Sequence, residues 1–286
     1  MSRRDRFIEA ADERLSVSEW GAGDSPVVLV HGLGSSSASL VPLAERLAAQ
    51  HRVIAVDLPG FGRSPWSGRE VSLARFARAV ARAVNALGVE RAIWIGHSMG
   101  GQIALRQALL QPRSISDLVL IAPAGIETFE PHHGRWLCEV VDEAFVRQQT
   151  PAQIRANAEM GFYRHSPHLE RLIEARIQMR SDPERLSEFA SVCAGCVKAM
   201  IDGPVESELG ALRSRTLIVF GEHDRLIPNP VLHPRLTTSQ IARRAVKLIP
   251  ASHAVMVPEA GHMVHFERPD IVYRHVEEWL SQTPTG

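Results

Sequence analysis

The sequence has no long apolar run, no excess of charge of either sign and few cysteines. None of its 286 residues belongs to a run approaching the roughly 18 apolar residues of a membrane span. Lys plus Arg and Asp plus Glu number 32 each, so neither nucleic acid nor an anionic membrane is indicated as a partner. Three cysteines are too few for a disulfide framework, and the basic residues 1–6 precede no apolar signal segment. These absences predict a cytoplasmic protein without stable membrane insertion, and they leave the oligomeric state open.

Motifs for cofactors and metals are incomplete. The G-x-G of residues 32–34 imitates the start of a dinucleotide fingerprint, but Ser37 stands where the third glycine is required. The C-x-x-C of residues 193–196 has no second pair for zinc and no preceding strand. His132 and His133 are adjacent and would point in different directions, so loop positions suit them better than metal ligation. We therefore expect neither a cofactor nor a metal.

What the sequence does contain is a regular alternation of apolar strands and amphipathic helices. Buried strands are predicted at residues 26–30, 52–56, 92–95, 118–121, 216–220 and 253–257. An earlier segment, residues 13–19, alternates apolar and polar positions and predicts an antiparallel strand. Because the connections between the buried strands have helical length, we expect a mostly parallel sheet with helices on both faces. Ligands of such sheets bind at the carboxyl ends of the strands.

The alternation breaks between residues 126 and 208, where the sequence shows no clear buried strand. Helices are predicted at 136–146, 151–163, 167–179 and 185–201. We therefore assign residues 1–125 and 209–286 to the core and residues 126–208 to a helical cap over the carboxyl edge of the sheet. Five large side chains of this insertion either line an acyl pocket or pack the cap on the core: Trp136, Met160, Phe162, Met179 and Met200.

A candidate nucleophile, Ser98, lies in the G-x-S-x-G of residues 96–100. An apolar strand precedes this motif and a helical segment follows it, which is the context of a nucleophile elbow. The tight turn forces the serine into a strained backbone conformation, and the flanking Gly96 and Gly100 have no Cβ atoms to clash there. We expect the turn to present the Ser98 hydroxyl above the N-terminus of the following helix.

A serine hydroxyl becomes a good nucleophile only when a base removes its proton. Histidine has a suitable pKa, and among the 13 histidines His262 follows the last strand at the same sheet edge as Ser98. His265, three residues on, is its rival. Asp224 follows the preceding strand and is favoured over Glu222 as the acid that orients the histidine. The chain order Ser98, Asp224, His262 is the one expected of this fold.

The negative charge that develops on a substrate oxygen needs two hydrogen-bond donors. Met99 N–H follows the nucleophile and begins a helix, whose dipole assists. The second donor should come from the loop after residues 26–30, where we select Leu33 N–H.

The chain resembles the α/β-hydrolase superfamily over nearly its whole length. The matching segments are residues 31–34 (HGLG), 57–64 (DLPGFGRS), 96–101 (GHSMGG), 221–224 (GEHD), 261–262 (GH) and 266–269 (FERP). HGLG together with GHSMGG is most similar to small serine carboxylesterases and monoacylglycerol-type lipases. The resemblance implies the α/β-hydrolase fold with a helical cap insertion.

On this basis we expect a hydrolase of carboxylic esters with short to medium acyl chains. The carbon–carbon bond hydrolases that act on vinylogous diketones share S-M-G-G, but they usually carry Asn before the serine and Trp after the histidine. His97 and Met263 occupy these positions here, which weakens that alternative. A non-catalytic receptor that binds a small ligand under the cap is a third reading of the same fold.

Overall fold

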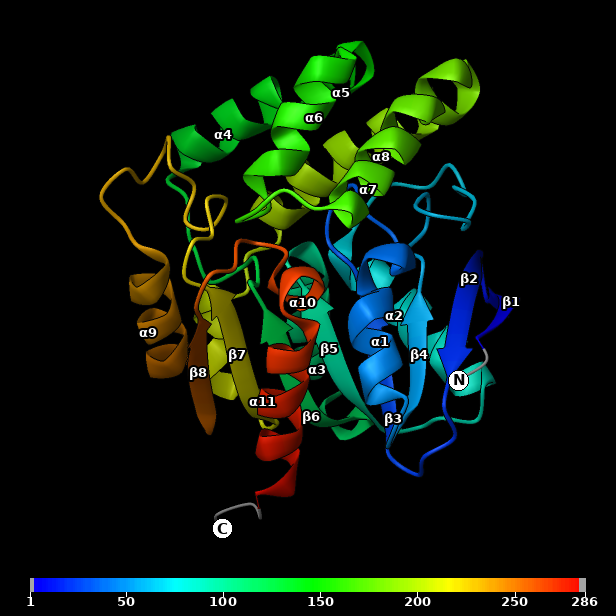
Figure 1. Cartoon of the computed structure of the whole chain (residues 1–286), viewed down its shortest axis with the longest axis vertical. Coiled ribbons are helices and arrows are strands. Elements are labelled where there is room, and N and C mark those ends of the chain that lie inside the picture. Colours follow the sequence, from blue (N-terminus) through cyan, green and yellow to red (C-terminus); the bar gives the residue numbers. More distant parts are fainter. Residues whose placement is uncertain (1–2, 283–286) are drawn as a thin grey trace.

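A single eight-stranded sheet runs through residues 3–282, the part of the chain that the computed structural model describes (Figure 1). Its strands are β1 (Arg4–Ala10), β2 (Glu13–Trp20), β3 (Pro26–Val30), β4 (Arg52–Val56), β5 (Ala92–His97), β6 (Ile115–Ile121), β7 (Arg215–Gly221) and β8 (Ser252–Val257). They are arranged in the order β1-β2-β4-β3-β5-β6-β7-β8. All pairings from β4 to β8 are parallel, whereas β1 and β2 run antiparallel at one edge. The expected mostly parallel sheet is confirmed.

Strand β1 is an element that the sequence did not predict. It begins with three charged residues, and all of its residues except Ile8 and Ala10 are exposed. Its pairing with β2 brings Arg6 opposite Val17 and allows the Arg6 guanidinium to form an ion pair with the buried Glu19. Pairing with a neighbouring strand, not burial of its own side chains, therefore defines this strand.

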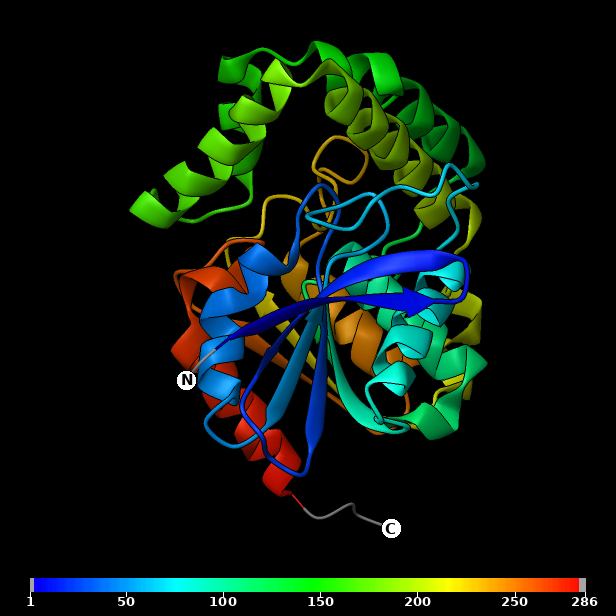
Figure 2. The same cartoon turned by 90° about the vertical axis from the view of Figure 1, so that its right-hand side faces the viewer.

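Helices cover both faces of the sheet (Figures 1 and 2). The helices of the core are α1 (Val41–Leu47), α2 (Leu73–Ala86), α3 (Met99–Leu110), α9 (Thr238–Leu248), α10 (Val264–Glu267) and α11 (Pro269–Ser281). Helices α1 and α11 pack on one face, and α2, α3 and α9 on the other. Along β3, Val27 and Leu29 contact the first layer, and Val28 and Val30 contact the second. Both faces are thus buried, as continuous apolar strands require.

Five further helices lie together beyond the carboxyl ends of the parallel strands (Figures 1 and 2). They are α4 (Pro131–Val140), α5 (Glu143–Gln148), α6 (Pro151–Met160), α7 (Pro167–Gln178) and α8 (Pro183–Asp202). Short 3₁₀ turns occur at Ser37–Leu40, Pro112–Ser114, Met179–Ser181 and Glu206–Ala211. His132 and His133 lie in the first turn of α4, not in a loop as expected. Within residues 3–282, no helix is both long and apolar enough to cross a membrane.

Three of the five large side chains considered in the insertion, Phe162, Met179 and Met200, pack in apolar clusters, whereas Trp136 and Met160 do not. Trp136 and Met160 are 39% and 38% exposed, so neither fills an interior space. Phe162 is buried in a small cluster with Leu169 and Ile173, against which Met263 also packs. This cluster lies where the helical insertion meets the loop that follows β8.

Candidate active site

Ser98 occupies a sharp turn between β5 and α3. Its backbone dihedrals are φ +55° and ψ −119°, a conformation that costs a non-glycine residue free energy. A Cβ on Gly96 would lie 2.3 Å from Gly100 O, so the turn could not close as tightly with a larger residue there. Ser98 N donates to Ile121 O at 2.9 Å, which fixes the turn to the end of β6. The expected elbow geometry is present.

Asp224 and His262 form a hydrogen-bonded pair at the same end of the sheet. His262 Nδ1 lies 2.9 Å from Asp224 Oδ2, and both side chains are buried. The other carboxylate oxygen, Oδ1, accepts hydrogen bonds from Leu226 N at 2.8 Å and Ile227 N at 3.0 Å. Two backbone donors and the imidazole thus hold the carboxylate in one orientation. Glu222 is exposed, and within residues 3–282 its side chain forms no hydrogen bond or ion pair.

The histidine loop lies next to the elbow. His97, the residue before Ser98, has Nε2 at 3.1 Å from His262 O, and the two rings have centroids 4.8 Å apart. Across the described part of the chain, no hydrogen bond joins Ser98 Oγ to His262. Before substrate binds, the contact between a nucleophile and its base is often longer than a hydrogen bond, so both residues can still act in one site.

Two backbone N–H groups lie beside Ser98 at the end of the sheet. Within residues 3–282, neither Leu33 N nor Met99 N donates a hydrogen bond. Met99 is the first residue of α3, where the helix dipole adds partial positive charge. Leu33 follows Gly32, and a Cβ built on Gly32 would lie 3.1 Å from Ser98 Cβ. The loop after β3 therefore passes directly beside the candidate nucleophile.

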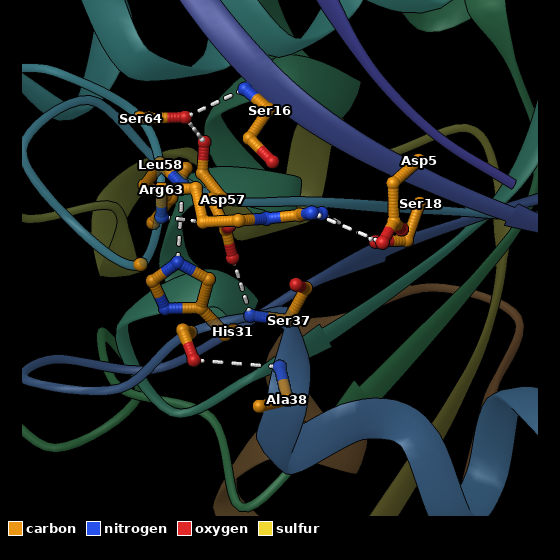
Figure 3. Close-up of polar contacts among 12 residues, drawn as sticks. Asp5, Ser16, Ser18, His31, Ser37, Ala38, Asp57, Leu58, Arg63 and Ser64 are labelled. Carbon is orange, nitrogen blue, oxygen red and sulfur yellow. Dashed lines mark hydrogen bonds and ion pairs between the residues drawn. The ribbon is translucent and has the colours of Figure 1, made fainter. Parts of the chain in front are cut away.

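Buried polar contacts hold the loop after β3 against the loop after β4 (Figure 3). His31 Nδ1–H donates to Gly32 O at 2.8 Å, and His31 Nε2 accepts from Leu58 N at 3.0 Å. Asp57 Oδ1 accepts from Ser37 N at 2.7 Å, at the far end of the same loop. Burial lowers the pKa of His31, because the imidazolium would lose its hydration. A neutral His31 with a fixed tautomer thus braces the segment that contains Leu33.

His265, the rival base, does not meet a carboxylate. Its ring is fully buried, and no carboxylate of residues 3–282 lies within 4.0 Å of its nitrogens. Burial, reinforced by the nearby His262, lowers the pKa of His265 to about 3. A buried imidazole without an acid to orient it is a poor general base, so the geometry favours His262.

Glu127 is a titratable residue near this site that sequence reasoning missed. The sequence offers no acid directly after Ile121, and Glu127 lies six residues further along the chain. Its side chain is 7% exposed, and its Oε1 accepts from Asn229 N at 2.8 Å. Burial is the main cause that raises the pKa of Glu127 to about 7, and Asp224 adds to it. Glu127 borders a cavity of about 360 Å³ that is also lined by Thr128, Phe129, Glu130, His233, Leu236 and Arg244.

We expect Glu127→Gln to change how stability depends on pH. The folded chain holds the Glu127 proton up to about pH 7, whereas the pKa of an ordinary glutamate is 4.5. The free energy of unfolding therefore falls as pH rises between these values, by roughly 2–3 kcal/mol from about pH 5 to pH 8. The glutamine variant should lose this contribution while still accepting from Asn229 N. Urea unfolding at both pH values measures this change in the free energy of unfolding, with the exposed Glu130→Gln as control. If the free energy of unfolding changes equally with pH in wild type and Glu127→Gln, the prediction is wrong.

The fold and these side chains together define a class of protein. A mostly parallel sheet with a strained serine after β5 and an Asp–His pair after β7 and β8 is the framework of a hydrolase. A family model described as "alpha/beta hydrolase fold" matches residues 25–269. The chain belongs to the α/β-hydrolase family.

The relatives carry several activities. The dihydrolipoyllysine-residue acetyltransferase component of the acetoin cleaving system of Pseudomonas putida is 30% identical over 260 residues, which cover 91% of this chain and 64% of that protein. The chain thus spans slightly less than two thirds of that relative's length. The 2-hydroxymuconate semialdehyde hydrolase of Pseudomonas putida is 29% identical, with 97% and 94% of the two chains covered. A solved structure described as a probable hydrolytic enzyme of Pseudomonas aeruginosa has a TM-score of 0.83 at 26% identity. The match covers 98% of this chain and 95% of that chain.

Proposed function

We propose that the protein hydrolyses carboxylic esters of short to medium acyl chains through Ser98, His262 and Asp224. The single observation that carries this proposal is the buried Asp224–His262 hydrogen bond at the sheet end where Ser98 occupies a strained elbow. Asp224 accepts from Nδ1, which leaves Nε2 of a neutral His262 with a lone pair for a serine proton.

The reaction follows from these positions. His262 Nε2 removes the proton as Ser98 Oγ attacks the acyl carbon, and the two unpaired amides, Leu33 N–H and Met99 N–H, stabilise the oxyanion. The alcohol leaves with the proton from His262, and an acyl group remains on Ser98. Water, deprotonated by the same imidazole, then releases the acid. Asp224 stabilises the imidazolium in both steps.

We further propose that residues 126–208 act as a cap that shapes the acyl site. Polar contacts attach this segment to the two loops that bear the acid and the base. Arg225, next to Asp224, donates to Glu159 O at 2.7 Å and Phe162 O at 2.8 Å. Glu267 accepts from Tyr163 N at 2.8 Å through one oxygen and from Gly261 N at 2.7 Å through the other. A shift of the cap would therefore be felt at His262.

A second function, hydrolysis of a carbon–carbon bond in a vinylogous diketone, is supported by one observation beyond the relatives' names. Arg176 of α7 is partly buried, and no carboxylate of residues 3–282 lies within 4.0 Å of its guanidinium. The guanidinium lies 4.2 Å from the ring centroid of Phe189, which packs edge-on against Phe61 near His31. A cation above the loop after β3 that has no carboxylate partner within residues 3–282 suits a substrate with an anionic group, which simple esters do not have.

Hydrolysis rates for p-nitrophenyl esters of rising chain length, measured beside a 2-hydroxy-6-oxo-dienoate, separate these functions. We expect turnover of the short and medium esters. The ester hydrolysis rates of Arg176→Gln and of the exposed control Arg171→Gln should both be close to that of the wild type. A higher kcat/KM for the dienoate, lost in Arg176→Gln alone, would replace the ester proposal by the second one. Binding of either compound without turnover would indicate a receptor.

A further inference from the structure

Three imidazole rings form a buried row beneath the elbow. The centroids of His262 and His97 are 4.8 Å apart, and those of His97 and His265 are 4.3 Å apart. All three residues are at most 5% exposed. The proposed reaction uses only His262, so the other two rings require a separate explanation.

The hydrogen bond of His97 defines its tautomer. Its partner is the carbonyl oxygen of His262, which can only accept, so Nε2 of His97 must bear the proton. Nδ1 is then unprotonated, and within residues 3–282 it has no hydrogen-bond partner. The Nε2–H group thus holds the backbone of the residue whose side chain is the proposed base.

The opposite side of the His97 ring supports the loop after β3. A Cβ built on Gly32 would lie only 2.9 Å from His97 Nδ1, so the backbone at this glycine rests directly on the ring. The next residue, Leu33, supplies a proposed oxyanion donor. One imidazole therefore separates the segment that holds the base from the segment that holds the donor.

His97 has only basic neighbours among the groups that face it. These are His262 and His265 from the chain after β8 and His31 from the end of β3. Burial lowers the pKa of His97 well below its usual value, and the three neighbouring imidazoles lower it further. No carboxylate of residues 3–282 lies within 4.0 Å of the His97 ring nitrogens, so the lowered pKa keeps the ring neutral when His262 becomes charged.

We propose that His97 is a positioning residue that sets the separation between the His262 loop and the Leu33 loop, with its Nε2–H bound to His262 O and its ring packed beneath Gly32. This role rests on the proposed function, because it serves the proton transfer and the oxyanion contacts together. His265 supports the ring from the far side.

Two substitutions separate the hydrogen bond from the packing. His97→Gln keeps a nitrogen donor at nearly the reach of Nε2, and His97→Leu keeps the apolar bulk but has no donor. Leaving a buried carbonyl unpaired weakens the positioning, so we expect kcat for p-nitrophenyl acetate to fall about ten- to hundredfold in His97→Leu with little change in KM. His97→Gln should recover most of this loss. Circular dichroism checks that both variants fold.

The possible results can be distinguished. If the wild type is active and His97→Leu has the same kcat, the inference is overturned. It is also overturned if the kcat of His97→Gln is no higher than that of His97→Leu, because packing alone then explains the site. A wild type that neither hydrolyses esters nor reacts with a fluorophosphonate at Ser98 would refute the proposed function, and with it the role of His97.

A measurement that does not depend on activity tests the contact itself. Nitrogen-15 spectra of protein labelled at histidine, assigned with His97→Gln, report which ring nitrogen bears the proton. We expect the Nε2–H form of His97 to persist between about pH 5 and pH 8, where free imidazoles titrate. A His97 that gains a second proton in this range, or that shows Nδ1–H, would contradict the proposal even if every variant folds poorly.

Discussion

Ser98→Ala is expected to reduce kcat for p-nitrophenyl acetate by about 10⁶-fold, the size of the effect when the nucleophile of a serine protease is removed. The alanine has no hydroxyl to attack the acyl carbon, so no acyl-enzyme can form. The Leu33 and Met99 amides would still bind a developing oxyanion, and water activated by His262 would give the residual rate. KM should change little, because a hydroxyl of this size contributes little to substrate binding.

The matched control is Ser114→Ala, since Ser114 lies just beyond the other end of α3. A fluorophosphonate should modify wild type and Ser114→Ala at Ser98 and leave Ser98→Ala unmodified, with the site read by peptide mass mapping. Retained turnover in Ser98→Ala, or an adduct mapped to another residue, would remove Ser98 from the mechanism.

Residues close in sequence gave the most reliable expectations. The elbow could be predicted because strand, G-x-S-x-G and helix follow one another without interruption, and the turn's close backbone approaches leave few residue types possible. Asp224 could be preferred to Glu222 because both follow the same strand and the turn geometry favours the later carboxylate. The structure buries Asp224 and exposes Glu222, as this reasoning requires.

Features that depend on distant parts of the chain could not be predicted in this way. Residues 245–249 form an apolar run, but most of them end α9, whose inward face is recognisable only once β7 and β8 are placed. The His97–His262 contact joins residues 165 positions apart. The raised pKa of Glu127 depends on its burial in the folded chain and on the nearby Asp224, which lies 97 positions further along the sequence. No local pattern specifies such encounters.

Asp224→Asn is expected to lower kcat by about 10⁴-fold, the size of the effect when the same change is made in a serine protease triad. That kcat falls, and does not rise, follows from the contacts of the Asp224 carboxylate. Oδ1 accepts from Leu226 N and Ile227 N, so the oxygen of an asparagine would stay there and its NH₂ group would face His262 Nδ1. A donor at this position forces Nδ1 to accept and moves the ring proton to Nε2.

An Nε2 that already bears a proton cannot take one from Ser98, so the Asp224→Asn loss should be largest near neutral pH. Part of the rate should return at high pH, where hydroxide assists removal of the serine proton. Glu222→Gln changes an exposed carboxylate that forms no hydrogen bond or ion pair within residues 3–282, so its kcat should stay within about twofold of wild type. Rates measured across pH for both variants, with circular dichroism for folding, test the assignment. A Glu222→Gln variant that loses more activity than Asp224→Asn would mean that the orienting acid lies two residues earlier, and that the loop after β7 rearranges when substrate binds.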